Sequence, residues 1–199
     1  MGFSFQSRHP RPAYFAGRIF SPVTAVLLGW LLAAACAGPA AAAPASQIEY
    51  QLKAGYLYNF AKFIEWPAPP LAAGAAFRVG VLVDENACAI IADTLRGRMI
   101  GDHPIEVVLL TPDSDPTGCR VVFVPRASSL TPAQFRERRP DAPVLLVGEK
   151  DGFAAAGGEI GFVPRGDNLR YQVNLSAAQR AGLKLSARLA SLAEIVRAP

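Results

Sequence analysis

Histidine is scarce in this sequence, and several signatures of enzyme chemistry are missing from it. Only two of the 199 residues are histidines, His9 and His103, too few for a His-rich metal site. No glycine-rich phosphate loop, G-x-S-x-G or H-E-x-x-H pattern occurs, and these motifs serve phosphate binding, ester hydrolysis and zinc-dependent proteolysis. The sequence therefore predicts a protein that is not an enzyme, with no catalytic residue, metal or cofactor.

Acidic residues are also missing from the first 45 positions, which have the order of a secretory signal peptide. Three arginines make the start basic, an apolar run covers residues 23–37, and small residues follow. The apolar run of 15 residues is shorter than the roughly 20 residues that a membrane-spanning helix needs. We therefore expect export to the periplasm, cleavage of residues 1–45, and no transmembrane span in the mature chain, residues 46–199.

Cys36 offers an alternative outcome for this leader. It follows three alanines in a loose lipobox, in which Leu32 lies one residue further from the cysteine than an ideal lipobox requires. Lipid attachment at Cys36 would anchor the protein to a membrane, whereas cleavage of a signal peptide would release it. An uncleaved membrane anchor is the third alternative for residues 1–45.

The charge of the mature chain is close to balanced. Three of the 20 basic residues lie in the leader and none of the 16 acidic ones does, which leaves a formal net charge of +1 in residues 46–199. Binding to nucleic acid needs a clustered excess of positive charge and is not expected. The one basic cluster, Arg136, Arg138 and Arg139, is interpreted as the solvated face of a helix.

Two cysteines remain after removal of the leader, Cys88 and Cys119. Because the periplasm oxidises pairs of thiols, the sequence predicts a disulfide between them, which would close a loop of about 30 residues. A reactive thiol at Cys88 is the alternative, since this residue lies close to a predicted helix start, where thiolates are favoured.

Strands and helices alternate along most of the mature chain, which is typical of a parallel sheet covered by helices. After a glycine pair at 157–158, two strands joined by a turn indicate a hairpin. The sequence thus predicts one α/β domain over residues 46–199, with a mostly parallel central sheet, helices on both faces, and a C-terminal β-hairpin followed by helices. The expected strands are 77–83, 105–110, 120–124, 144–147, 160–163 and 169–173, and the expected helices are 46–65, 86–96, one from Thr131, 177–181 and one from Ser186 to about Val196.

Carboxylates follow two of the predicted parallel strands. Asp84 and Glu85 come after the strand 77–83, and Glu149 comes shortly after the strand 144–147. The carboxyl ends of strands frame the ligand crevice of an open α/β sheet, so these residues are candidates for a small-molecule site. The alternative is that they cap helices and turns.

The first predicted helix, residues 46–65, is apolar over much of its circumference. Two apolar stripes run along it, so it needs cover on more than one side. Either it lies deep in the domain, or it lends one stripe to a partner, since tyrosine and tryptophan are enriched in protein interfaces. The candidates for contact with a partner or with a second copy of the chain are Tyr50, Leu57, Tyr58, Lys62 and Trp66.

The segment 53–67, K-A-G-Y-L-Y-N-F-A-K-F-I-E-W-P, is similar to the opening motif of the YfiR/HmsC-like periplasmic family. The similarity continues in order along nearly all of the mature chain. It includes the strand 77–83, the cysteine-then-strand segment 119–124, the glycine-rich segment 144–158, and the segments 171–175 and 181–186.

This resemblance implies a soluble periplasmic repressor. The repressor would bind the periplasmic sensing domain of an inner-membrane diguanylate cyclase, hold it inactive and so lower cyclic di-GMP. It also implies a homodimer and disulfides that keep the protein folded, although residues 149–158 lack the second cysteine pair that some relatives carry. The alternatives are a periplasmic small-ligand-binding protein and an accessory subunit of another envelope sensor, such as a histidine kinase.

Overall fold

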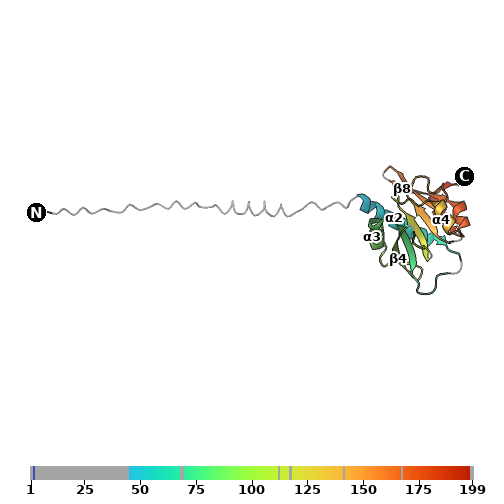
Figure 1. Cartoon of the computed structure of the whole chain (residues 1–199), viewed down its shortest axis with the longest axis horizontal. Coiled ribbons are helices and arrows are strands. Elements are labelled where there is room, and N and C mark those ends of the chain that lie inside the picture. The colour runs from blue at the N-terminus through green and yellow to red at the C-terminus, as the bar shows by residue number, and fades with distance from the viewer. Residues whose placement is uncertain are drawn as a thin grey trace. The chain divides into compact units, whose positions relative to one another are not determined.

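The structure is a computed structural model of the chain (Figure 1). It describes residue 2 and residues 45–67, 70–111, 113–116, 118–140, 142–166 and 168–197. The predicted signal peptide, apart from its residues 2 and 45, and the candidate lipidation site Cys36 lie outside the described residues. Residues 43–199 group into one compact unit, which contains the helices and strands named below.

An eight-stranded sheet forms the centre of this unit, in the order β10-β8-β7-β6-β5-β2-β4-β3. Neighbours are parallel from β4 through β2, β5 and β6 to β7, and β10 is parallel to β8, whereas β7–β8 and β3–β4 are antiparallel. The predicted α/β class, mostly parallel sheet and C-terminal hairpin are confirmed. The strands are β2 (Phe77–Leu82), β3 (Met99–Ile100), β4 (His103–Leu110), β5 (Cys119–Val124), β6 (Leu145–Gly148), β7 (Ile160–Arg165), β8 (Asn168–Asn174) and β10 (Glu194–Val196), and a separate pair joins β1 (Ile64–Glu65) to β9 (Lys184–Leu185).

Helices cover both faces of the sheet. On one face lie α2 (Ala45–Phe63) and α3 (Glu85–Leu95), and on the other lies α4 (Pro132–Arg138) (Figure 1). Two short helices, α5 (Leu175–Arg180) and α6 (Ala187–Ser191), follow β8. Each of the last four helices begins after an Asp, Thr, Asn or Ser whose side chain accepts a backbone N–H of the first turn, so local sequence sets these starts.

Successive residues of the central strands point to opposite faces of the sheet. Because these strands are almost wholly apolar, they contribute side chains to two hydrophobic cores. Val121 and Phe123 of β5 join Leu57 and Phe60 of α2 in the larger core. The smaller core, on the α4 face, contains Leu82, Cys119, Val122, Val124, Phe135, Leu146 and Phe153. The apolar runs that predicted buried strands therefore pack against helices on both faces of the sheet.

The last predicted helix is wrong in its second half. α6 ends at Ser191, and residues 194–196 form β10 alongside β8. The spacing of Leu189, Leu192 and Val196 resembles a helical face, but β8 would otherwise be the edge of the sheet. Pairing with that edge satisfies its backbone groups, and this tertiary effect overrides the local pattern.

The predicted disulfide between Cys88 and Cys119 is not formed, and both residues are free cysteines. In the pairing of β2 with β5, Arg78 lies opposite Cys119 and Val79 opposite Val121, so one extra residue bulges out between them. This bulge turns Cys119 into the core on the α4 face. Cys88 packs against the core on the other face. The sheet separates the two thiols, whereas a disulfide needs Cα atoms within about 7 Å.

Two glycines of the glycine-rich segment 144–158 leave space for one aromatic ring. Phe153 is buried in the smaller core, and its ring lies directly against the backbone of Gly148 and Gly158. A Cβ atom at either glycine would collide with the ring. Neither glycine has a positive φ angle, so the requirement is for space. The motif thus has a packing role in this fold.

Arg136 holds α4 onto the sheet. Its guanidinium donates to the carbonyl oxygens of Ala142 at 2.8 Å and Val144 at 2.9 Å, and to Oε1 of Glu159 at 2.7 Å. Glu159 is fully buried, and its Oε2 accepts the N–H of Leu146 at 2.7 Å. The interpretation of Arg136 as part of a solvated basic face is therefore wrong, because this residue pairs with a buried carboxylate.

Glu159 is expected to give the fold a distinctive pH dependence. Burial raises the pKa of the Glu159 carboxyl above its ordinary value of 4.5, although Arg136 and the Leu146 N–H oppose the shift. The native state then holds this proton more tightly than the unfolded state. The group's contribution to stability is complete below pH 4.5 and is lost as pH rises through the raised pKa.

Urea unfolding at a series of pH values tests this. The unfolding free energy of the protein relative to its Glu159→Gln variant should fall as pH rises from about 4.5. Glu137→Gln, on the exposed side of α4 next to Arg136, is the control and should show no such trend. A difference that rises with pH would contradict the assignment.

Candidate functional site at the carboxyl ends of the strands

The parallel strands β2, β5 and β6 are neighbours in the sheet, so their carboxyl ends lie at the same edge. At this edge the chain passes from β2 and from β5 to opposite faces of the sheet. After β2 the chain enters α3 on one face, and after the neighbouring β5 it continues to α4 on the other. Such a switch point is where open α/β sheets bind ligands. Asp84 follows β2, Arg126 follows β5 and Glu149 follows β6. The predicted candidates Asp84 and Glu149 thus lie at this edge.

A lysine from α2 fills this position. Nζ of Lys53 lies 2.5 Å from Oε1 of Glu149, and the two residues are only 3% and 4% exposed. The same ammonium group also pairs with Glu49, one helical turn earlier. The other oxygen of Glu149 accepts the backbone N–H of Arg126 at 2.8 Å. Both oxygens of the buried carboxylate are therefore occupied within the chain, as burial of a charge requires.

A tyrosine from α2 adds a second polar contact. The hydroxyl of Tyr50 donates to Oδ2 of Asp84 at 3.1 Å, while Oδ1 of Asp84 accepts the N–H of Ala87 at 2.8 Å and caps α3. The Tyr50 ring lies edge-on to Phe123, with ring centroids 6.4 Å apart. Burial, with the charges of Glu149 and Asp84, raises the pKa of the Tyr50 hydroxyl. The hydroxyl therefore stays protonated and acts as a donor.

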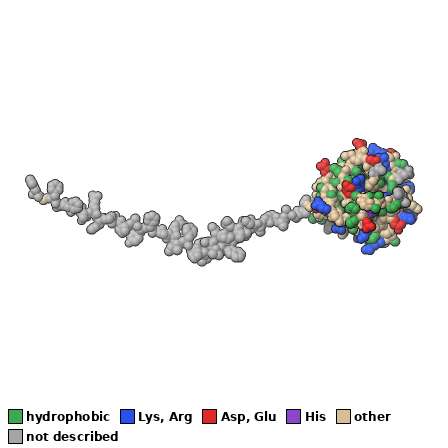
Figure 2. Space-filling view, turned by 90° about the horizontal axis from the view of Figure 1, so that it is seen from below, with side chains coloured by type: hydrophobic (Ala, Val, Ile, Leu, Met, Phe, Trp, Pro, Cys, Tyr) green, Lys and Arg blue, Asp and Glu red, His purple; other side chains and the backbone are tan. Residues whose placement is uncertain are grey.

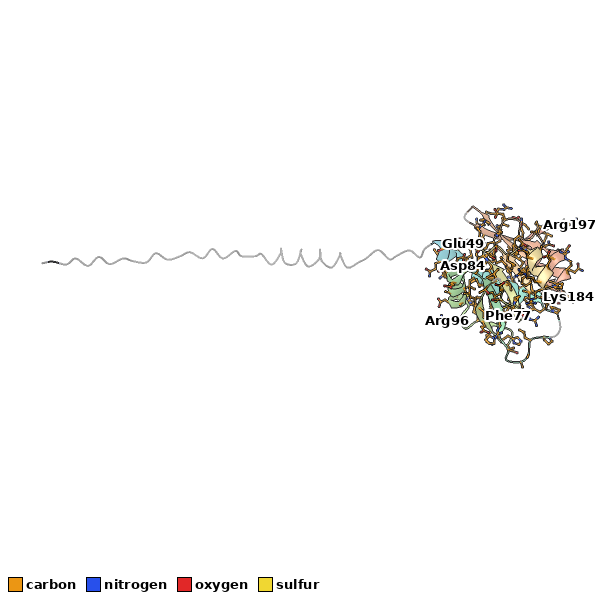
Figure 3. All side chains as sticks on the ribbon, in the orientation of Figure 1. Glu49, Phe77, Asp84, Arg96, Lys184 and Arg197 are labelled. Carbon is orange, nitrogen blue, oxygen red and sulfur yellow. The ribbon has the colours of Figure 1, made fainter. Side chains whose placement is uncertain are left out.

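In this arrangement α2, a helix of the protein itself, closes the crevice. Figure 3 shows Glu49 of α2 and Asp84 at the same end of the folded unit. Asp84 acts as a helix cap, as the alternative interpretation predicted, and Glu85 is an exposed residue in the first turn of α3. We name Tyr50, Lys53, Asp84 and Glu149 the strand-end cluster. Its groups hold α2 in place and leave no unpaired carboxylate for a ligand.

The five candidate interface residues have different surroundings, and four of them lie on α2 while Trp66 follows β1. Leu57 is completely buried in the core, so its assignment to a surface is wrong. Tyr50 belongs to the strand-end cluster. Tyr58 and Trp66 are half-buried, the former with the Arg98 guanidinium 5.1 Å from its ring and the latter edge-on to Phe77 at 5.4 Å. Lys62 is exposed. Tyr58, Lys62 and Trp66 remain candidates for a partner contact.

Two further apolar residues on α2 are more exposed than the four aliphatic and aromatic candidates. Ile48 is 57% exposed and Leu52, one turn later, is 49% exposed. Both belong to one apolar stripe of the helix, but this end of the stripe faces solvent. The spacing of apolar residues along the helix identifies the stripe, but it does not show which part of the stripe packs against the sheet. We name Ile48 and Leu52 the α2 apolar pair.

Neither a cluster of metal-ligating side chains nor a membrane-spanning helix is found in the described part of the chain. Within it, no group of three or more His, Cys, Asp or Glu side chains is placed to hold a metal ion. No described helix combines the length and apolar character that crossing a bilayer requires. Figure 2 shows basic and acidic side chains interspersed over the visible face.

None of the curated proteins matches this chain. A family model described as YfiR/HmsC-like matches residues 50–194, from Tyr50 of the strand-end cluster to the start of β10. The matched region contains the buried pair Lys53–Glu149, the glycines around Phe153 and the C-terminal hairpin. By this match over most of its length, the chain belongs to the YfiR/HmsC-like family.

Proposed function

We propose that this protein is exported to the periplasm, binds the periplasmic sensing domain of an inner-membrane diguanylate cyclase and holds the cyclase inactive, which lowers cyclic di-GMP. Membership of the YfiR/HmsC-like family carries this proposal, because that family is associated with periplasmic regulation of these cyclases. The protein would act by binding one conformation of the cyclase more tightly than the other and so shifting its population.

The strand-end cluster supports regulation by binding rather than by catalysis. Its charged groups are paired with one another, and α2 fills the crevice in which this type of sheet takes a substrate. The α2 apolar pair supplies exposed apolar area on a helix that is anchored from its inner side. A rigid helix with an exposed apolar pair is well suited to contact another protein, because little ordering is needed on binding.

Leu52→Glu is expected to weaken binding to the cyclase domain at least about tenfold, because a charge would be buried against the partner. Gln51→Glu is the control, since this neighbouring residue is also exposed and gains the same charge. The measurement is a titration of the cyclase's periplasmic domain with each purified protein. Cyclic di-GMP in the host should rise on deletion of the gene and in the Leu52→Glu strain, and stay low in the Gln51→Glu strain.

Two outcomes would contradict parts of this proposal. Unchanged cyclic di-GMP after deletion of the gene, with no cyclase domain bound, would overturn the function. Capture of a histidine kinase sensor would then favour the accessory-subunit alternative. Equal binding by Leu52→Glu and Gln51→Glu would keep the function and move the contact to Tyr58, Lys62 and Trp66. Homodimer formation is a separate part of the proposal, and sedimentation velocity of the mature protein tests it.

A further inference from the structure

A groove opens between the second half of α2, strand β8 and the helix α6. Its volume is about 390 Å³, within the range of small-molecule sites. It lies away from the strand-end cluster and shares no residue with it. The lining residues are Tyr56, Asn59, Phe60 and Phe63 from α2, Arg170 and Tyr171 from β8, and Arg188, Leu189 and Leu192 from α6 and the residue after it.

The inner wall of the groove is apolar and fixed. The hydroxyl of Tyr56 donates to the carbonyl oxygen of Leu169 at 3.0 Å, and that of Tyr171 to the carbonyl oxygen of Leu189 at 2.9 Å. Both tyrosines therefore use their polar atoms within the protein. The rings of Tyr171 and Phe60 are edge-on with centroids 5.0 Å apart. An apolar ligand body would meet aromatic surface that is already ordered, which reduces the entropic cost of binding.

Two arginines make the rim of this groove positively charged. Arg170 and Arg188 are both exposed, and the Arg188 guanidinium lies 5.4 Å from the centre of the Phe63 ring. None of the described lining residues is acidic. The nearby Glu194 is bound by Arg165 at 3.1 Å and by Gln172 at 3.3 Å. Guanidinium groups bind carboxylate and phosphate through paired hydrogen bonds, so this rim favours an anion.

We propose that this groove binds an amphipathic organic anion, with its apolar chain along the aromatic wall and its carboxylate or phosphate head between Arg170 and Arg188. Leu192, which is 63% exposed at the rim, would be covered by the ligand's chain. Apolar contact supplies affinity and the two guanidinium groups supply the preference for negative charge. The proposal goes beyond regulation of a cyclase and stands without it.

Calorimetric titration of the mature protein with decanoate, below its micelle concentration, tests this site. Saturable binding is expected, and Arg170→Gln/Arg188→Gln should weaken it at least about tenfold. Arg96→Gln, at the exposed C-cap of α3, should bind decanoate as the unmodified protein does. Leu192→Glu, a change at an exposed position, should also weaken binding and serves if the double variant fails to fold. Decyl phosphate in a parallel titration distinguishes a phosphate head from a carboxylate head.

Two further ligands separate the contributions of head and chain. Decyltrimethylammonium has the chain with a positive head, and acetate has the head without the chain, so neither should bind. Binding of decyltrimethylammonium as tight as that of decanoate would overturn the proposal, since the groove would then not select anions. Undiminished decanoate binding by both the double arginine variant and Leu192→Glu would overturn it as well, because the bound site would lie elsewhere.

Discussion

Replacing Lys53 with methionine is expected to reduce the free energy of unfolding by about 3–5 kcal/mol, because it leaves the Glu149 carboxylate buried without its cation. The Glu149 side chain is 5% exposed, and only the Arg126 N–H would remain as a partner. Chemical denaturation of the two proteins measures the difference. Lys62→Met, on the exposed side of the same helix, is the control and should change stability by less than about 0.5 kcal/mol.

Replacing Glu149 should reduce the free energy of unfolding less than replacing Lys53 does. In Glu149→Gln, the Lys53 ammonium keeps Glu49 as a partner, and the amide oxygen can still accept the Arg126 N–H. The double variant Lys53→Met/Glu149→Gln has no buried charge in the cluster, so we expect it to be more stable than Lys53→Met alone. A double-mutant cycle gives the coupling between the two residues. Strictly additive effects would show that the pair does not hold α2 in place.

Alanine at Gly148 or Gly158 is expected to lower stability by about 2–3 kcal/mol each, because a Cβ atom at either position enters the space of the Phe153 ring. The ring cannot move away easily, since it is buried between the two glycines. Thermal or denaturant unfolding measures this cost.

Gly55→Ala is the matched control for these two glycines. It lies within α2, and no atom stands within 4 Å of the Cβ that would be added. Alanine there should raise stability by about 0.5–1 kcal/mol, because it is the better helix former. If all three alanine variants changed stability in the same direction, the packing role of Gly148 and Gly158 would be wrong.

Much of the fold follows from short-range patterns, and the exceptions have identifiable physical causes. Apolar runs bounded by turns identify the central strands, and Thr131 identifies the start of α4. The orientation of Cys119 depends on the extra residue in its pairing with β2. A bulge of this kind is a property of two strands together, so the sequence of one strand does not reveal it.

The candidate site was predictable in part. The rule that strand ends frame the crevice correctly located Asp84 and Glu149, but it did not identify what occupies the space between them. Lys53 lies between the two apolar stripes near the centre of the helix, and that position is the signal that could have identified it as buried and paired. The exposure of Ile48 and Leu52 depends on how far the sheet extends beneath α2, which no local pattern encodes.

The pairing of Lys53 with Glu149 has a consequence for the nascent chain. The two residues are 96 positions apart, and α2 is the first element of the folded unit to leave the ribosome. Contacts at such a separation form late, since the intervening chain must first be ordered. Until Glu149 has been synthesised, the lysine keeps its hydration and opposes docking of α2 onto the sheet. Docking of α2 is therefore expected only after most of the folded unit has been synthesised.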